Sequence, residues 1–74
     1  MNKKYKKEIT SRLNHLRGTM KVAEFSRKLG VGNSTVWYYM SGNRIPFADF
    51  LAIVVKKLGA NGSWLLTGEG DPYL

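Results

Sequence analysis

The sequence predicts an all-α fold, a compact bundle of about five short helices. Apolar residues recur along most of the chain at the three- and four-residue spacing of amphipathic helices. Glycines separate these apolar stretches at the points where helices would end. The chain has 74 residues, of which 43% are hydrophobic, so it suits one small folded domain and is too short for a large core.

The chain begins with a basic stretch, residues 1–7, which we expect to be an N-terminal arm or a frayed first turn. It either follows a nucleic-acid backbone or forms a disordered, solubilising tail. Its basic residues are Lys3, Lys4, Lys6 and Lys7. Ile9, Leu13 and Leu16 follow at helical spacing and predict a first helix over residues 7–17.

Residues 25–42 carry the most informative pattern, two short amphipathic segments joined by a glycine turn. Thr19 is placed to cap the first of these two helices, and Leu29 closes it. Gly30 suits a chain that reverses out of a helix, because glycine takes a positive φ at little steric cost. A helix over residues 33–41 then buries Val36, Tyr39 and Met40. This is the layout of a helix-turn-helix, whose second helix enters a groove of DNA.

Two further helices are expected. Pro46 suits the first position of a fourth helix that Gly59 ends. Its expected buried face consists of Phe47, Phe50, Leu51, Val54 and Leu58. Asn61 is placed to cap a short fifth helix that Gly68 ends.

The fifth helix is unusually apolar for an element that packs on one side only. Trp64, Leu65 and Leu66 either complete the core or pair with a second copy, so they form the candidate dimer interface. The expected organisation is a basic arm over residues 1–7, a DNA-binding domain over 8–70, and a tail or the start of a linker over 71–74.

The charge balance favours a polyanionic partner. Twelve Lys and Arg against five Asp and Glu give a formal net charge of +7. A nucleic acid is the first candidate, although charge alone would serve an anionic membrane surface or an acidic protein equally well. The absence of cysteine fits a reducing cytoplasm. The longest apolar run, residues 51–55, is far shorter than the ~20 residues of a membrane span.

Several motifs resemble those of the lambda-repressor-like DNA-binding domains of phage repressors and Cro proteins. Leu29-Gly30-Val31 resembles the family's inter-helix turn, and Ser34-Thr35-Val36 resembles the start of its recognition helix. The ending Trp64-Leu65-Leu66-Thr67-Gly68-Glu69-Gly70 is similar to the end of this domain in phage cI-type repressors. The resemblance covers roughly residues 9–70.

The resemblance also implies which residues meet DNA. Asn33, Ser34, Trp37 and Tyr38 would face the groove, and Ser41, Asn43 and Arg44 would lie near the phosphate backbone. It further implies a homodimer that binds two half-sites about one helical turn apart. The sequence departs from the family where Ser26 replaces a packed alanine, and where Trp37 and Tyr38 replace small or polar residues.

The start of the candidate recognition helix offers polar groups for base reading. Asn33 can pair its amide with adenine, or it can cap the helix. Ser34 suits a base edge or a phosphate, or it too is a cap. Thr35 either gives its methyl group to a thymine or faces solvent.

Aromatic and cationic residues follow. Because consecutive helical residues point about 100° apart, a buried Val36 leaves Trp37 or Tyr38 exposed. These rings either contact DNA or form a covered edge of the core. Arg44 either clamps a phosphate or is a solvated charge.

Nothing in the sequence indicates an enzyme. His15 has no second histidine or cysteine to form a metal site, and we expect it to be a surface or half-buried polar residue. No catalytic triad, nucleophile turn or glycine-rich phosphate loop is recognisable. We therefore expect no cofactor, no metal and no small-molecule substrate.

The leading hypothesis is a phage or prophage repressor that binds double-stranded DNA at a palindromic operator as a dimer. Two alternatives stay open. One is a helix-turn-helix protein-interaction module, such as an antitoxin or an adaptor. The other is a non-specific DNA binder.

Overall fold

Residues 3–74 are described by a computed structural model, with side chains from residue 4 onwards. Within this part of the chain there are five helices and no β-strand. They are α1 (Lys3–Arg17), α2 (Val22–Leu29), α3 (Asn33–Met40), α4 (Ala48–Leu58) and α5 (Gly62–Thr67). The predicted all-α bundle is confirmed. None of these helices is both long enough and apolar enough to cross a bilayer.

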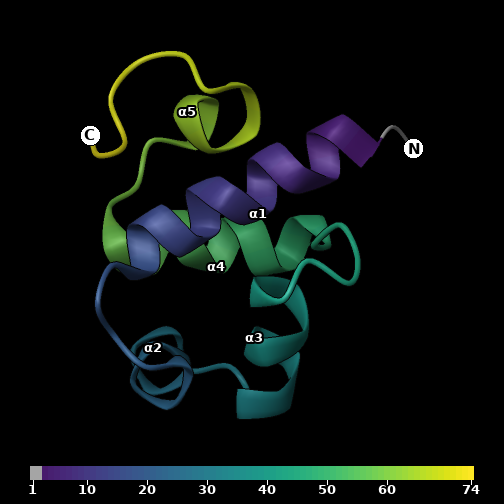
Figure 1. The fold of residues 1–74 in the computed structure, drawn as a ribbon. Coiled ribbons are helices and arrows are strands. Elements are labelled where there is room, and N and C mark those ends of the chain that lie inside the picture. The colour runs from purple at the N-terminus through teal and green to yellow at the C-terminus, as the bar shows by residue number, and fades with distance from the viewer. Residues whose placement is uncertain (1–2) are drawn as a thin grey trace.

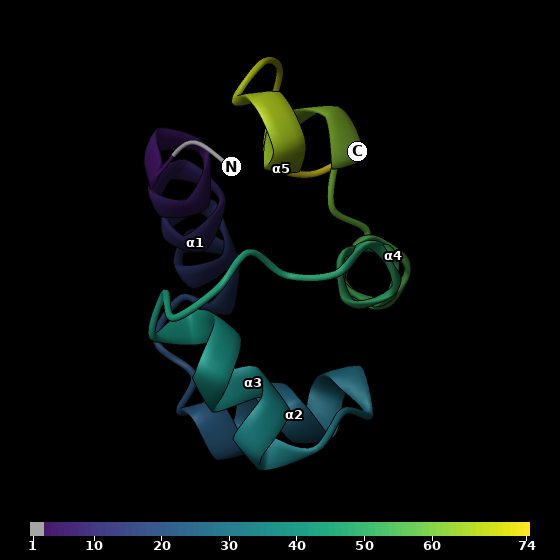
Figure 2. The ribbon, with the colours of Figure 1, turned by 90° about the vertical axis from the view of Figure 1, so that its right-hand side faces the viewer.

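The helices form three levels (Figure 1). Helices α1 and α4 occupy the middle level, α2 and α3 lie together below them, and α5 lies above them. The second view separates α1 from α4, which lie on opposite sides of the molecule (Figure 2). The Cα radius of gyration is 11.2 Å, the value expected for a compact domain of this length.

One hydrophobic core joins the levels. Its largest fully buried side chains come from every helix; they are Leu13, Phe25, Leu29, Val36, Val54 and Leu65. Burying side chains of this size contributes about 1.5–3 kcal/mol each. The core therefore fixes α3 from behind and leaves its outer face to solvent.

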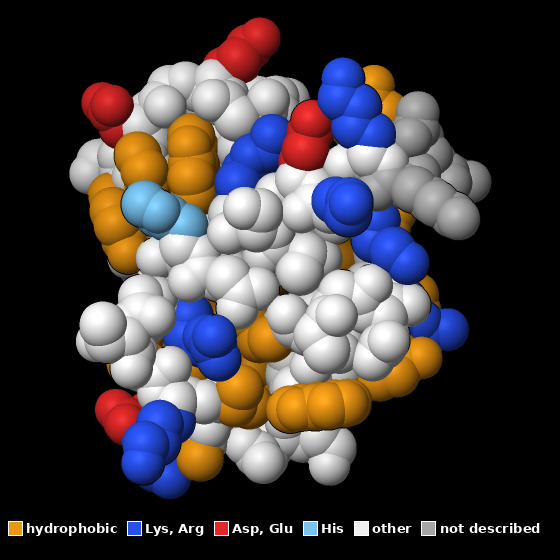
Figure 3. All heavy atoms as spheres, in the orientation of Figure 1, with side chains coloured by type: hydrophobic (Ala, Val, Ile, Leu, Met, Phe, Trp, Pro, Cys, Tyr) orange, Lys and Arg blue, Asp and Glu red, His pale blue; other side chains and the backbone are white. Residues whose placement is uncertain are grey.

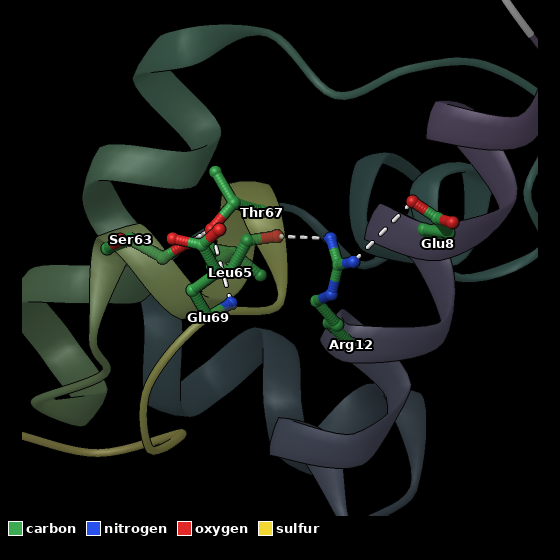
Figure 4. Close-up of polar contacts among 6 residues, drawn as sticks. All are labelled: Glu8, Arg12, Ser63, Leu65, Thr67 and Glu69. Carbon is green, nitrogen blue, oxygen red and sulfur yellow. Dashed lines mark hydrogen bonds and ion pairs between the residues drawn. The ribbon is translucent and has the colours of Figure 1, made fainter.

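Arg12 fastens α1 to the end of α5 (Figure 4). Its Nη1 donates a hydrogen bond to the carbonyl of Leu65 at 3.2 Å, and its Nη2 lies 3.6 Å from a carboxylate oxygen of Glu8. Gly68 closes α5 with a φ of +84°, and a Cβ there would lie 2.8 Å from Nη2 of Arg12. Glycine is favoured at this position because the conformation is left-handed, and a side chain here would also displace the Arg12 guanidinium.

The segment after α5 folds back onto the domain. Ala60 and Tyr73 form an isolated antiparallel bridge. The amide of Asn61 donates to the carbonyl of Pro72 at 2.8 Å, and that of Leu74 donates to Gly59 at 3.1 Å. Residues 71–74, predicted as a tail or the start of a linker, are thus paired with the turn between α4 and α5.

Two helix starts differ from the sequence prediction. Helix α1 begins at Lys3, four residues before its predicted start, so the described part of the predicted arm is helical. Met1 and Asn2 lie outside the described residues. Thr19 does not cap α2, because it lies in the turn that follows α1, and α2 begins only at Val22 with Lys21 as its cap residue.

The start of α4 also differs. Pro46 is buried but precedes the helix, which begins at Ala48 with Phe47 as its cap residue. An extended backbone turns the Phe47 side chain away from the core, and 60% of it is exposed. Its predicted place on the buried face is therefore wrong, whereas Phe50 and Val54 are buried as predicted.

Candidate nucleic-acid interface

Helices α2 and α3 form the predicted helix-turn-helix. Gly30 has a φ of +71°, and its amide donates to the carbonyl of Arg27 at 3.3 Å. The amide of Val31 donates to Ser26 at 3.1 Å. These two bonds form a Schellman motif, which satisfies carbonyls at the end of α2 and redirects the chain into α3.

Helix α3 turns one face to the core and the other to solvent. Val36, Tyr39 and Met40 are buried as predicted. Asn14 of α1 donates to the carbonyl of Met40 at 3.1 Å and so holds the far end of α3. The outer face consists of exposed side chains that were all predicted to meet DNA; they are Asn33, Ser34, Thr35, Trp37 and Tyr38.

Asn33 is tethered to α2 by Ser26, the residue that departs from the family pattern. The Ser26 hydroxyl is buried, and it lies 2.9 Å from the carbonyl of Val22 and 3.1 Å from Oδ1 of Asn33. Gly32, not Asn33, is the cap residue of α3, and there is no side-chain cap bond. Among residues 4–74, Nδ2 of Asn33 makes no hydrogen bond, so both of its protons can be donated outward.

The two aromatic residues of α3 are exposed, Trp37 by 56% and Tyr38 by 42%. The Tyr38 ring contacts Tyr39 at a centroid distance of 6.5 Å, and Tyr39 contacts Phe50 at 4.7 Å. Tyr38 is therefore anchored to the core from one side, while Trp37 projects further into solvent.

The loop after α3 is held by its own side chains. The Ser41 hydroxyl donates to the carbonyl of Tyr38 at 2.9 Å, and Nδ2 of Asn43 donates to Ser41 Oγ at 2.7 Å. Both residues are exposed. They shape the loop that carries Arg44, and the remaining donor and acceptor groups of Asn43 still face solvent.

Arg44 lies against two aromatic rings. Its guanidinium carbon is over the Tyr38 ring at 5.6 Å from the centroid and over the Phe47 ring at 5.4 Å. Sequence reasoning missed Phe47, because its helical spacing pointed to the core. Its exposure could have been predicted from its position directly before α4, because the side chain of a cap residue need not face the core.

The lysines near the N-terminus approach this loop. Lys6 and Lys7 of α1 line a cavity of about 560 Å³ together with Thr10, Ser11, Ser41 and Gly42. The structure thus brings two arm lysines to the loop after α3. Lys4 is exposed on the same helix, and the side chain of Lys3 lies outside the described residues.

Charge is divided along the molecule. All twelve Lys and Arg lie within residues 3–57, whereas residues 58–74 contain Glu69 and Asp71 and no basic residue. In Figure 3, basic side chains lie across the α1 and α2 parts of the visible face together with a few acidic ones, whereas only acidic ones stand at its α5 end. The basic residues therefore lie on α1, on α2 and just before it, in the loop that carries Arg44 and in the last turn of α4, and none lies at the α5 end.

The predicted dimer residues have different environments. Leu65 is fully buried, and Trp64 is partly buried with its ring 5.5 Å from that of His15. Leu66 is 51% exposed and borders an apolar groove of about 340 Å³ between α4 and α5. Of the three, Leu66 is the one whose side chain can reach a partner without disrupting the core.

Within the described residues there is no group of three or more His, Cys, Asp or Glu side chains that could hold a metal ion. Comparison with curated proteins and with solved structures finds no match. Comparison with protein families finds one that spans nearly the whole fold: residues 8–73 match the bacteriophage CI repressor helix-turn-helix domain. The chain therefore belongs to the bacteriophage CI repressor helix-turn-helix family, whose members are DNA-binding regulators.

Proposed function

We propose that this domain is a sequence-specific repressor module that inserts α3 into the major groove of a palindromic operator. It would act in the cytoplasm of a bacterial host and block transcription by occupying the site. Asn33 and Ser34 would read base edges, Trp37 would pack on thymine methyl groups or sugars, and Arg44 would bind a phosphate.

The composition of the outer face of α3 is the observation that carries this proposal. The face presents amide, hydroxyl and aromatic groups that the core does not use. A purely non-specific binder gains nothing from a short amide such as that of Asn33 at the groove, since backbone contacts carry no sequence information. The twelve Lys and Arg residues, all within residues 3–57, would supply the attraction to DNA.

We also propose that two copies pair through the α4–α5 side. Leu66 and the neighbouring apolar groove support this part of the proposal, because an exposed leucine beside such a groove suits a second copy. The α5 end carries no Lys or Arg, and Lys56 is the one basic residue among those that line the groove. A dimer of this kind would place two α3 helices for two half-sites.

Selection of bound sites from a random duplex library at near-physiological salt tests the proposal. The expected result is an enriched palindrome whose half-sites are about one helical turn apart. Recovery of DNA without enrichment would support the non-specific binder. Absence of recovery would contradict DNA binding and favour the protein-interaction module, with Trp37 and Tyr38 as its contact residues.

A further inference from the structure

Phe47 occupies a position that neither core packing nor helix capping explains. Its side chain is 60% exposed, so it contributes little to the core. It is the cap residue of α4 but has no side-chain acceptor, whereas Ser, Thr, Asp or Asn would satisfy a free amide there. The contact of the Phe47 ring with Arg44 is the remaining explanation for a large apolar side chain at this position.

Arg44 is held by rings and not by hydrogen bonds. Tyr38 and Phe47 lie 5.6 and 5.4 Å from its guanidinium carbon, within the range of a cation–π contact. Arg44 makes no hydrogen bond or ion pair with any other residue in the part of the chain from residue 4 onwards. Ring contacts occupy none of the five N–H donors, which stay available for an acceptor outside the protein.

Both rings belong to residues whose backbone is part of a helix or of a helix start. Tyr38 is linked to the core through Tyr39 and Phe50. The backbone of Phe47 is held at the start of α4, where its carbonyl accepts from the amide of Leu51 at 3.2 Å. An arginine that already contacts two rings loses less conformational freedom on binding than a free one.

We propose that Phe47, together with Tyr38, is a positioning residue that orients Arg44 for a DNA phosphate. This inference rests on the proposed DNA-binding function. Phe47 acts through Arg44 and not by contacting the bases. Its ring holds the cation, and the cation donates two hydrogen bonds to the phosphate oxygens.

A double-mutant cycle with Arg44→Ala tests the inference. The probe is the duplex recovered by selection, or a mixed-sequence duplex if no site is enriched. Phe47→Ala should weaken binding about two- to fivefold, as expected for loss of one exposed cation–π contact. Phe47→Tyr should restore the affinity, whereas Phe47→Leu, which is apolar but not aromatic, should not.

In the Arg44→Ala background, Phe47→Ala should have no further effect. Equal losses in both backgrounds would overturn the inference, because they would mean that Phe47 acts independently of Arg44. An unchanged affinity for Phe47→Ala would overturn it as well. If the wild-type protein binds no duplex at all, the proposed function fails and the inference fails with it.

Nuclear magnetic resonance of the free protein gives a second readout. The side-chain protons of Arg44 should show upfield ring-current shifts that Phe47→Ala reduces and Phe47→Tyr retains. Unchanged Arg44 shifts in Phe47→Ala would contradict the contact. Because Phe47 is exposed, the melting temperatures of these variants should stay close to that of the wild type.

Discussion

Exposed apolar side chains occur at two ends of the molecule, and they differ in what accompanies them. On the helix-turn-helix side, the rings of Trp37, Tyr38 and Phe47 lie near amide and hydroxyl groups and a cation. On the α5 side, Leu66 borders an apolar groove, and residues 58–74 contain no Lys or Arg. Nucleic acids need donors and positive charge as well as stacking surfaces. Only the first side has all three.

The largest effect is expected within the α5 side, between two neighbouring leucines. Leu65→Ala should lower the free energy of unfolding by about 2–5 kcal/mol, because it leaves a cavity in the core. Leu66→Ala should change it by less than about 0.5 kcal/mol in a dilute sample, because its side chain is half exposed. Urea denaturation, monitored by circular dichroism, measures the change in the free energy of unfolding for both variants. Equal losses would contradict the different roles of the two residues.

On the DNA-facing side, Asn33→Ala should weaken binding to the selected duplex by about 1–3 kcal/mol, because it removes a base contact. The melting temperature should stay nearly unchanged, since Asn33 is exposed. Ser26→Ala is the matched variant. It keeps the side-chain amide of Asn33 but removes the hydroxyl that tethers it, so the loss of DNA affinity should be smaller than for Asn33→Ala. Fluorescence anisotropy gives the affinities. A larger loss for Ser26→Ala than for Asn33→Ala would show that the tether, and not the amide, matters.

Arg12 is a basic residue that we expect to act on the fold and not on DNA. Arg12→Ala should lower the free energy of unfolding by about 1–2 kcal/mol, because the charged hydrogen bond to the Leu65 carbonyl is lost. A lysine cannot make the contacts with the Leu65 carbonyl and the Glu8 carboxylate from one planar group, so Arg12→Lys should recover only part of the lost stability. Both proteins, once folded, should keep the wild-type salt dependence of DNA binding. A flatter salt dependence would place Arg12 at a phosphate.

The smallest effect concerns the lysines of α1. Replacing Lys6 and Lys7 by Gln should reduce the slope of log affinity against log salt by ~0.9 for each lost phosphate contact. Lys57→Gln, in the last turn of α4, removes the same charge as Lys6→Gln alone and should leave the slope close to that of the wild type. A slope equal to that of the wild type for the Lys6 and Lys7 variant would mean that these lysines contact no phosphate.

Local patterns predicted most of the fold. Gly30, Gly59 and Gly68 end their helices with the expected left-handed conformation, and Asn61 caps α5 by accepting from the amide of Ser63. The buried residues of α3 followed from spacing alone. These features depend on residues close together in the chain, and for that reason one sequence was sufficient.

The exact starts of helices and the contacts between residues far apart in the sequence could not be predicted. The start of α1 and the place of Phe47 depend on how the chain enters and leaves each helix. The Arg12 contact with the Leu65 carbonyl joins residues far apart in sequence, and a polar pattern on α1 gives no sign of it. The tether from Ser26 to Asn33 likewise crosses the turn and needs the geometry of both helices.

Cross-saturation from DNA protons to the amides of the deuterated protein would test most directly which side meets DNA. It detects proximity to the duplex and does not respond to pairing between copies. We predict strong transfer to residues 33–44 and none to residues 60–74. Transfer to the α5 side, with α3 unaffected, would contradict the account.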